Sequence, residues 1–245
     1  MNKAINKYLK YITLTAPVVI SILAFAIIIF IVIIPQVEES VIEQRKEGAK
    51  DIVNAAIYFM EYNNDLVNKG QISLKDAQDQ VIEVIRHIRY GHEFKDYFWI
   101  NDMHPTMIMH PYRLELEGRD LSNYTDAKGK KLFVEMVKVV EDSGEGFVDY
   151  MWQWKDDYLL ISPKISFVHE FKPWGWIIGT GIYTENIKAE IKVIERNILR
   201  LFAGIVIIVL LLQILSIYLY IKIEHRRAQS TNELSNKENH YKVPV

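Results

Sequence analysis

Two long apolar stretches stand near the ends of the chain, with amphipathic and alternating patterns between them. Residues 18–34 contain one polar side chain, Ser21, and residues 201–221 carry no charge. At ~1.5 Å per residue, a helix of this length crosses a hydrocarbon core of ~30 Å. The pattern therefore predicts two transmembrane helices, at residues 16–35 and 198–221.

The first stretch has a second interpretation, as a cleaved signal peptide whose positive region holds Lys3, Lys7 and Lys10. The apolar part is long for that role, and residues 33–38 lack a small-x-small cleavage pattern. We therefore expect an uncleaved anchor.

The charged flanks predict the orientation of both spans. Three lysines and no acid precede the first span, and three basic side chains against one acid follow the second, within residues 222–227. An excess of basic residues marks cytoplasmic flanks. Residues 1–15 and the tail 222–245 are thus predicted to be cytoplasmic, and residues 36–197 to form one outer domain. That segment holds 20 Lys and Arg against 28 Asp and Glu.

The outer domain begins with helical periodicity and then changes to strands. Apolar residues three and four apart predict a helix from Gln36 to about Tyr62, continuing the first span. Ser73, with Asp76 three residues later, is a good N-cap for a second helix ending near Arg89. Five strands are predicted, at residues 97–100, 106–110, 147–154, 165–171 and 176–182.

The segments between these strands complete the pattern. Asn101 and Asp102 are predicted to form a turn, residues 132–140 a short helix, and Thr184 the cap of a final helix that leads into the second span. Two helices followed by a five-stranded antiparallel sheet with one helical insertion define an α+β fold. A segment of this length can bury a core of its own.

Composition excludes several functions. The 245-residue chain has no Cys, which removes disulfides, thiolate zinc sites and cysteine nucleophiles. Its net charge of −2 argues against a nucleic-acid protein that relies on overall positive charge.

Several motifs resemble the single Cache domain family, type 2, over residues 36–197. They are Tyr97-Phe98-Trp99-Ile100-Asn101-Asp102, Met109-His110-Pro111, Leu116-Glu117-Gly118-Arg119-Asp120-Leu121, Gly144-Glu145-Gly146-Phe147-Val148-Asp149-Tyr150, Pro163-Lys164 and the run from Phe171 to Tyr183. Each motif is weakly specific alone, but together they stand in the family's order between two spans.

This resemblance implies a PAS-like sheet and an extracytoplasmic sensor domain of bacterial chemoreceptors or sensor kinases, in the cell (inner) membrane. It implies a small organic ligand, such as acetate, pyruvate or lactate, and we expect a homodimer without a cofactor. Family members usually continue into a signalling module, whereas only residues 222–245 follow the second span here. We therefore expect either an output domain on a separate cytoplasmic signalling protein or a shortened protein.

His110 and Lys164 are the predicted ligand anchors. A carboxylate in a partly dry pocket needs strong donors, which both side chains provide. Both positions match motifs of the resembled family. The alternatives are a histidine bonded within the core and a lysine that faces water at the start of a strand.

Aromatic residues supply the candidate walls of the pocket. Tyr97 and Trp99 share one strand face, as do Tyr150 and Trp152, and Tyr183 ends the last strand. Their rings can wall a small pocket, with hydroxyl or indole N–H groups as donors. The alternative for the first four is ordinary sheet core.

Metal binding and catalysis are the rival chemistries. His104, His110 and Asp102 offer nitrogen and oxygen ligands, but the two histidines stand six positions apart with a proline between them. We expect no metal site. No phosphate loop, zinc-hydrolase motif or nucleophile–base pair is evident, so we expect no enzyme.

Two functions remain. The first is a sensor that passes a conformational signal through the second span to the cytoplasm. The second is a membrane-anchored accessory or structural subunit that presents its outer domain to a partner protein, which the short tail favours.

Overall fold

The computed structural model describes residues 2–91 and 93–241, in two compact units. One unit combines Met1–Val37 with Lys192–Val245, and the other is Glu38–Ile191. In chain order the elements are α1 (Asn2–Ile27), a π-helix (Ile28–Ile33), α2 (Ile34–Asn68), α3 (Leu74–His87), β1 (Phe98–Asp102), β2 (Met107–Met109), a 3-10 turn (Leu114–Leu116), α4 (Leu132–Ser143), β3 (Glu145–Trp154), β4 (Asp157–Phe171), a second 3-10 turn (Lys172–Trp174), β5 (Trp176–Tyr183) and α5 (Thr184–Tyr241).

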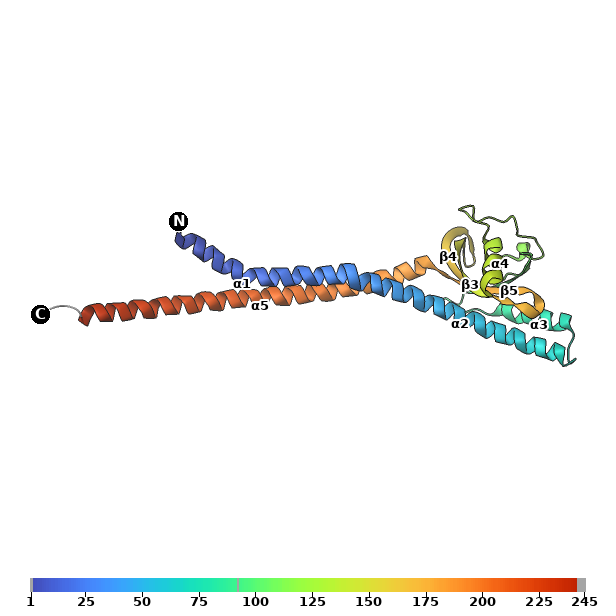
Figure 1. The fold of residues 1–245 in the computed structure, drawn as a ribbon, viewed down its shortest axis with the longest axis horizontal. Helices are drawn as coiled ribbons and strands as arrows, with labels where there is room; N and C mark the ends of the chain where they lie inside the picture. Colours follow the sequence, from blue (N-terminus) through green and yellow to red (C-terminus); the bar gives the residue numbers. More distant parts are fainter. Residues whose placement is uncertain (1, 92, 242–245) are drawn as a thin grey trace. The chain divides into compact units, whose positions relative to one another are not determined.

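The first unit pairs α1 with the distal part of α5, which lie side by side (Figure 1). Both helices include segments long and apolar enough to cross a membrane. The amide of Gln213 donates to the Leu14 carbonyl at 2.9 Å, and Lys10 pairs with Glu224 at 2.8 Å. A polar side chain within an apolar span therefore has a partner on the other helix.

The π-helix of the first span has a local cause. Pro35 lacks an N–H, and its ring crowds the carbonyl four residues earlier, which disfavours a regular α-helical turn. The chain widens just before this proline, where the N–H of Ile34 bonds to the carbonyl of Ile29, five residues back.

The second unit is built on a five-stranded sheet in the order β2-β1-β5-β4-β3, with every adjacent pair antiparallel. This confirms the predicted α+β fold, its five strands and the helical insertion between the second and third of them. The predicted Ser73 cap is also confirmed, since its hydroxyl accepts from the N–H of Asp76 at 3.1 Å.

Helices cover both faces of the sheet, so the unit has three layers (Figure 1). On one face, α2 and α3 pack against Phe98, Ile100, Phe167 and Ile178. On the other face, the buried side of α4 packs against tyrosine and tryptophan side chains of β1 and β3. Polar and charged groups buried on this second face form the candidate site.

Three predicted boundaries are wrong. The helix predicted to end at about Tyr62 continues to Asn68. Asn101 and Asp102 continue β1 and pair with β5, and the turn follows them, where the Asp102 carboxylate accepts the N–H groups of His104 and Thr106. The strand predicted at residues 165–171 begins at Asp157, because its first half pairs with β3 beyond the end of β5.

Candidate functional site

The α4-covered face of the sheet carries a row of three side chains from three neighbouring strands. Tyr150 on β3 pairs with Lys164 on β4, which pairs with Tyr183 at the end of β5. Cross-strand partners project from the same face, so two tyrosines flank the lysine. Tyr97 and His110, which adjoin β1 and β2, lie close by with their rings 4.9 Å apart.

Two glycines of β5 make room for these large side chains. A Cβ on Gly179 would lie 2.5 Å from the Trp99 ring. A Cβ on Gly181 would lie 2.6 Å from Cε of Lys164 and would also collide with Ser166 Oγ. The alternation of glycines in this strand therefore creates the space for the lysine stem and the indole.

Lys164 is almost completely buried, with 1% of its surface exposed. Its Nζ donates to the Tyr97 hydroxyl at 3.1 Å and lies 4.2, 5.3 and 5.1 Å from the ring centres of Tyr97, Trp99 and Tyr183. Among the described residues, no carboxylate comes within 4.0 Å of this ammonium. Burial lowers the pKa of Lys164 to about 7, and the charge of Asp96 opposes that shift only in part.

His110 is buried as well, and its hydrogen bonds determine its tautomer. Its Nδ1 lies 3.1 and 2.9 Å from the backbone N–H groups of Tyr112 and Arg113, so Nδ1 accepts. The proton of the neutral ring is then on Nε2, which is a donor. Burial first, then the charge of Lys164 and of three arginines, lowers the pKa of His110 well below its usual value.

These cations give the site a positive electrostatic character. The arginines are Arg86, Arg89 and Arg113, from α3 and the loops at the edge of the site. Arg86 forms a bidentate pair with Glu117, at 2.6 and 3.0 Å, and the same carboxylate accepts the N–H of His110. A buried lysine near several arginines favours an anion.

The remaining predicted residues divide into walls and internally bonded donors. Trp152 packs against His110 at 5.8 Å and Tyr150 at 6.0 Å. The Trp99 indole N–H donates to Asn101 at 3.1 Å, and the Tyr150 hydroxyl is 2.9 Å from Ser166. The Tyr183 hydroxyl donates to the Gln153 carbonyl and accepts the N–H of Lys155. Trp99, Tyr150 and Tyr183 therefore present their rings to the cluster, while their polar groups have protein partners.

A small cavity lies within this cluster. It has about 160 Å³ of empty volume and is too narrow to hold a water molecule. Its walls are Trp99, His110, Leu132, Phe133, Tyr150 and Trp152. Lys164 does not line the cavity itself, but its ammonium lies beside Trp99, which does. Tyr97 contacts both the ammonium and the His110 ring.

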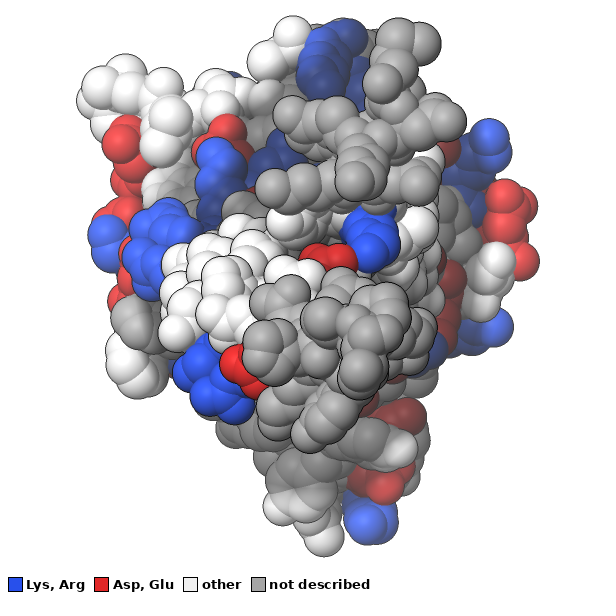
Figure 2. Space-filling view, turned by 90° about the vertical axis from the view of Figure 1, so that its left-hand side faces the viewer, with Lys and Arg blue, Asp and Glu red and all other residues white. Residues whose placement is uncertain are grey.

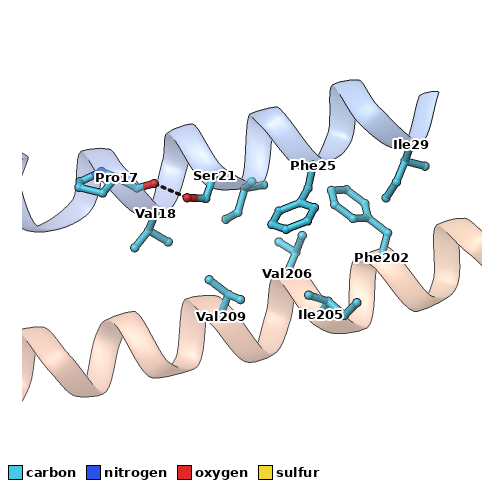
Figure 3. A pocket seen from close by; sticks show the side chains of 10 residues that line it. Pro17, Val18, Ser21, Phe25, Ile29, Phe202, Ile205, Val206 and Val209 are labelled. Atoms are coloured by element: carbon cyan, nitrogen blue, oxygen red, sulfur yellow. Dashed lines mark hydrogen bonds between the residues drawn. The ribbon is translucent and has the colours of Figure 1, made fainter. Parts of the chain in front are cut away.

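Other hollows offer different chemistry. A groove of about 420 Å³ between α1 and α5 is apolar, with Phe25 and Phe202 facing each other and the Ser21 hydroxyl bonded to the Pro17 carbonyl (Figure 3). A second hollow, of about 350 Å³, lies beside the start of α5. Its charges already pair with one another, as Arg45 with Glu190, and Lys155 with Glu93 and Asp96.

On the face drawn in Figure 2, the described basic and acidic side chains are interspersed. Among the described residues, no group of three or more histidine, aspartate or glutamate side chains is placed to hold a metal ion, so His104, His110 and Asp102 do not form one.

Several residues that shape the site were not predicted from the sequence. Gly179 and Gly181 had a visible signal, two glycines two apart inside a strand-like run, which indicates close approach of other groups. Arg113 follows three residues after His110 but reads as an ordinary loop residue. Its role depends on contacts across the chain, which no local pattern predicts.

The strand order and the apolar helices define a class of protein, an α+β domain of PAS-like strand order joined to two long apolar helices. Residues 41–197 match the Single Cache domain 2 family, and the chain belongs to this family.

Known relatives include bacterial chemoreceptors and sensor kinases. The chain is 36% identical over 167 residues to the methyl-accepting chemotaxis protein McpP of Pseudomonas putida. The matched segment covers 68% of this chain and 30% of that protein. It is 27% identical over 153 residues to the sensor histidine kinase MctS of Rhizobium johnstonii. That match covers 62% of this chain and 32% of the kinase. The chain thus spans about a third of the length of these two relatives.

Solved structures agree with this assignment. One, described as the periplasmic sensor domain of a chemotaxis protein, shares 40% identity at a TM-score of 0.56 and covers 58% of this chain and 96% of that one. Another, from work on carboxylic acid recognition by a Cache chemosensory domain, shares 37% identity at a TM-score of 0.56. It covers 59% of this chain and 97% of the solved chain.

Proposed function

We propose that this protein is a membrane-anchored sensor whose outer domain binds a short carboxylate and does not convert it. The observation that carries the proposal is the buried ammonium of Lys164, which has three aromatic rings around it and donates to the hydroxyl of one of them, Tyr97. A charge buried without a counter-charge is costly, and an anionic ligand would supply the missing partner.

The proposed ligand sits between Lys164, Tyr97 and His110. Its carboxylate accepts from Nζ, from the Tyr97 hydroxyl and from Nε2 of His110, in charge-assisted hydrogen bonds. Trp99, Tyr150, Trp152 and Tyr183 act as walls around a short tail, as in acetate, pyruvate or lactate. The cavity is small, so side chains must shift to admit even these acids.

A structural relative supports this ligand class. The structure at 37% identity comes from a study of carboxylic acid recognition by a Cache domain. The buried lysine and the positive electrostatic character of the site support the same chemistry in this chain.

The route of the signal follows from the end of β5. Tyr183 pairs with Lys164 and directly precedes Thr184, the first residue of α5. That helix continues into the second apolar segment. A ligand that binds one arrangement of these groups better than another shifts the population and thereby moves α5.

The proposal also covers the location and the assembly of the protein. We place it on the outer side of a bacterial inner membrane, with both termini in the cytoplasm, as the charged flanks favour. We propose that the protein acts as a homodimer and passes its signal to cytoplasmic signalling partners.

A thermal-shift screen of the full-length chain in detergent against small organic acids, amines and neutral compounds tests the proposal. A ligand at 100 times its dissociation constant adds about 2.7 kcal/mol of stability. We expect short carboxylates to raise the melting temperature. If no acid does so, the carboxylate proposal is wrong, and tight binding of a partner protein to the outer domain would favour an accessory subunit instead.

A further inference from the structure

The structure restricts how a solute reaches the cavity. The sheet, with Trp99, Tyr150 and Trp152, closes one side, and α2 and α3 lie behind it. The opposite wall consists of His110 and the first residues of α4. Both parts of that wall are attached to surface loops, so entry from solvent passes between those loops.

Arg113 lies at this entrance, over the Trp152 ring. Its guanidinium carbon is 5.7 Å from the ring centre, and Nη1 donates to Gln153 Oε1 at 3.3 Å. Its Nε also pairs with Glu115. The Trp152 residue is 4% exposed, whereas 24% of the Arg113 side chain is exposed, so the arginine covers the indole from the solvent side.

The backbone of the same residue supports the proposed ligand donor. The N–H of Arg113 donates to Nδ1 of His110 at 2.9 Å, which keeps the histidine proton on Nε2. Tyr124 completes the cover, with its ring 5.8 Å from that of Trp152. One loop residue thus connects the entrance with the donor inside.

We propose that the Arg113 side chain sets the upper length of the carboxylic acids that the site accepts. This inference rests on the proposed carboxylate function. A short tail fits within the cavity once its walls relax, whereas a longer tail must displace the guanidinium from Trp152, Gln153 and Glu115. A planar guanidinium that stacks and hydrogen-bonds at once resists displacement better than a flexible side chain.

Calorimetric titration of the full-length protein in lipid nanodiscs with acetate, propionate, butyrate and valerate tests this proposal. The wild type should lose affinity steeply along the series. In Arg113→Ala, valerate should gain at least tenfold relative to acetate, because the cover over Trp152 is gone. A length profile identical to that of the wild type would overturn the proposal.

Two further variants distinguish the effect of the stacked guanidinium from the effect of its positive charge. Arg113→Lys keeps the charge but not the planar stack, so it should show the relaxed length profile with near-normal affinity for acetate. Glu115→Ala removes one ion pair but leaves the guanidinium on Trp152 and Gln153, so it should relax the profile less than Arg113→Ala does. A profile as relaxed as that of Arg113→Ala would contradict the role of the stack.

The same titrations distinguish the two proposals. If acetate binding depends on Lys164 but Arg113→Ala keeps the wild-type length profile, only the proposed role of Arg113 is overturned. A wild type that binds no acid in the series overturns both.

Discussion

At the residue scale, Lys164 lies in an environment that disfavours its charge. Tyr97, Trp99 and Tyr183 surround the ammonium of Lys164 with aromatic faces, and cation–π attraction compensates only part of its lost hydration. A purely structural role would be served as well by an apolar residue, since buried charges commonly lower stability. The proposed carboxylate would supply the counter-charge that Lys164 lacks.

The pKa of about 7 for Lys164 predicts how binding depends on pH. A carboxylate binds the protonated amine, and the free site loses that proton as pH rises through 7. His110 does not contribute in this range, because its pKa lies well below its usual value. We expect the affinity for acetate to fall by about tenfold between pH 6 and pH 8, measured by calorimetry. An affinity that is constant, or that rises, over this range would contradict a protonated Lys164 as the anchor.

The residues of the site were predictable in part. His110, Lys164 and the aromatic residues were selected from motifs, and the structure brings them into one cluster. The direction of each polar group was not predictable. Trp99 bonds to Asn101, two residues along the same strand, whereas Tyr183 bonds to the turn after β3 through a tertiary contact. Sequence patterns indicate which face a side chain occupies, but not its hydrogen-bond partner.

At the scale of single elements, β5 is the strand that shapes the site. Its two glycines stand opposite side chains that need their space, Trp99 and Lys164. The exposed half of β4 was missed because it pairs only with β3 and carries four consecutive apolar side chains, Tyr158 to Ile161, rather than an alternating pattern. Alternation predicts strands that are buried on one face and fails for such an extension.

A single methyl group on β5 should therefore disturb the site. In Gly181→Ala, the new Cβ meets Lys164 Cε at 2.6 Å, so the lysine stem must move and the overpacked variant should lose ~1–3 kcal/mol of stability. Acetate binding should weaken as well. Gly48→Ala is the matched control, because nothing lies within 4 Å of its new Cβ and alanine favours the helix. Chemical denaturation measures the free energy of unfolding of both variants. An unchanged value for Gly181→Ala would mean that the strand can accommodate the methyl group.

At the scale of the whole molecule, the membrane topology can be tested. The charged flanks predict both termini on the cytoplasmic side and the outer domain on the other side. A reporter fused after residue 245 should be active only in the cytoplasm, and one inserted beside Lys128 only outside. Finding both reporters on the same side would remove the two-span arrangement and the route from the site to the cytoplasm.

Carboxylate binding at Lys164 is the central claim, and calorimetric titration of Lys164→Met with the best acid from the screen tests it most directly. Removing one member of a buried charge pair costs ~2–5 kcal/mol of binding free energy, so affinity should fall at least thirtyfold at ~1.4 kcal/mol per tenfold. The ligand-free variant should melt at a higher temperature than the wild type, because a buried unpaired charge has been removed. Near-normal affinity together with a lower melting temperature would show that Lys164 belongs to the sheet core and that the carboxylate binds elsewhere.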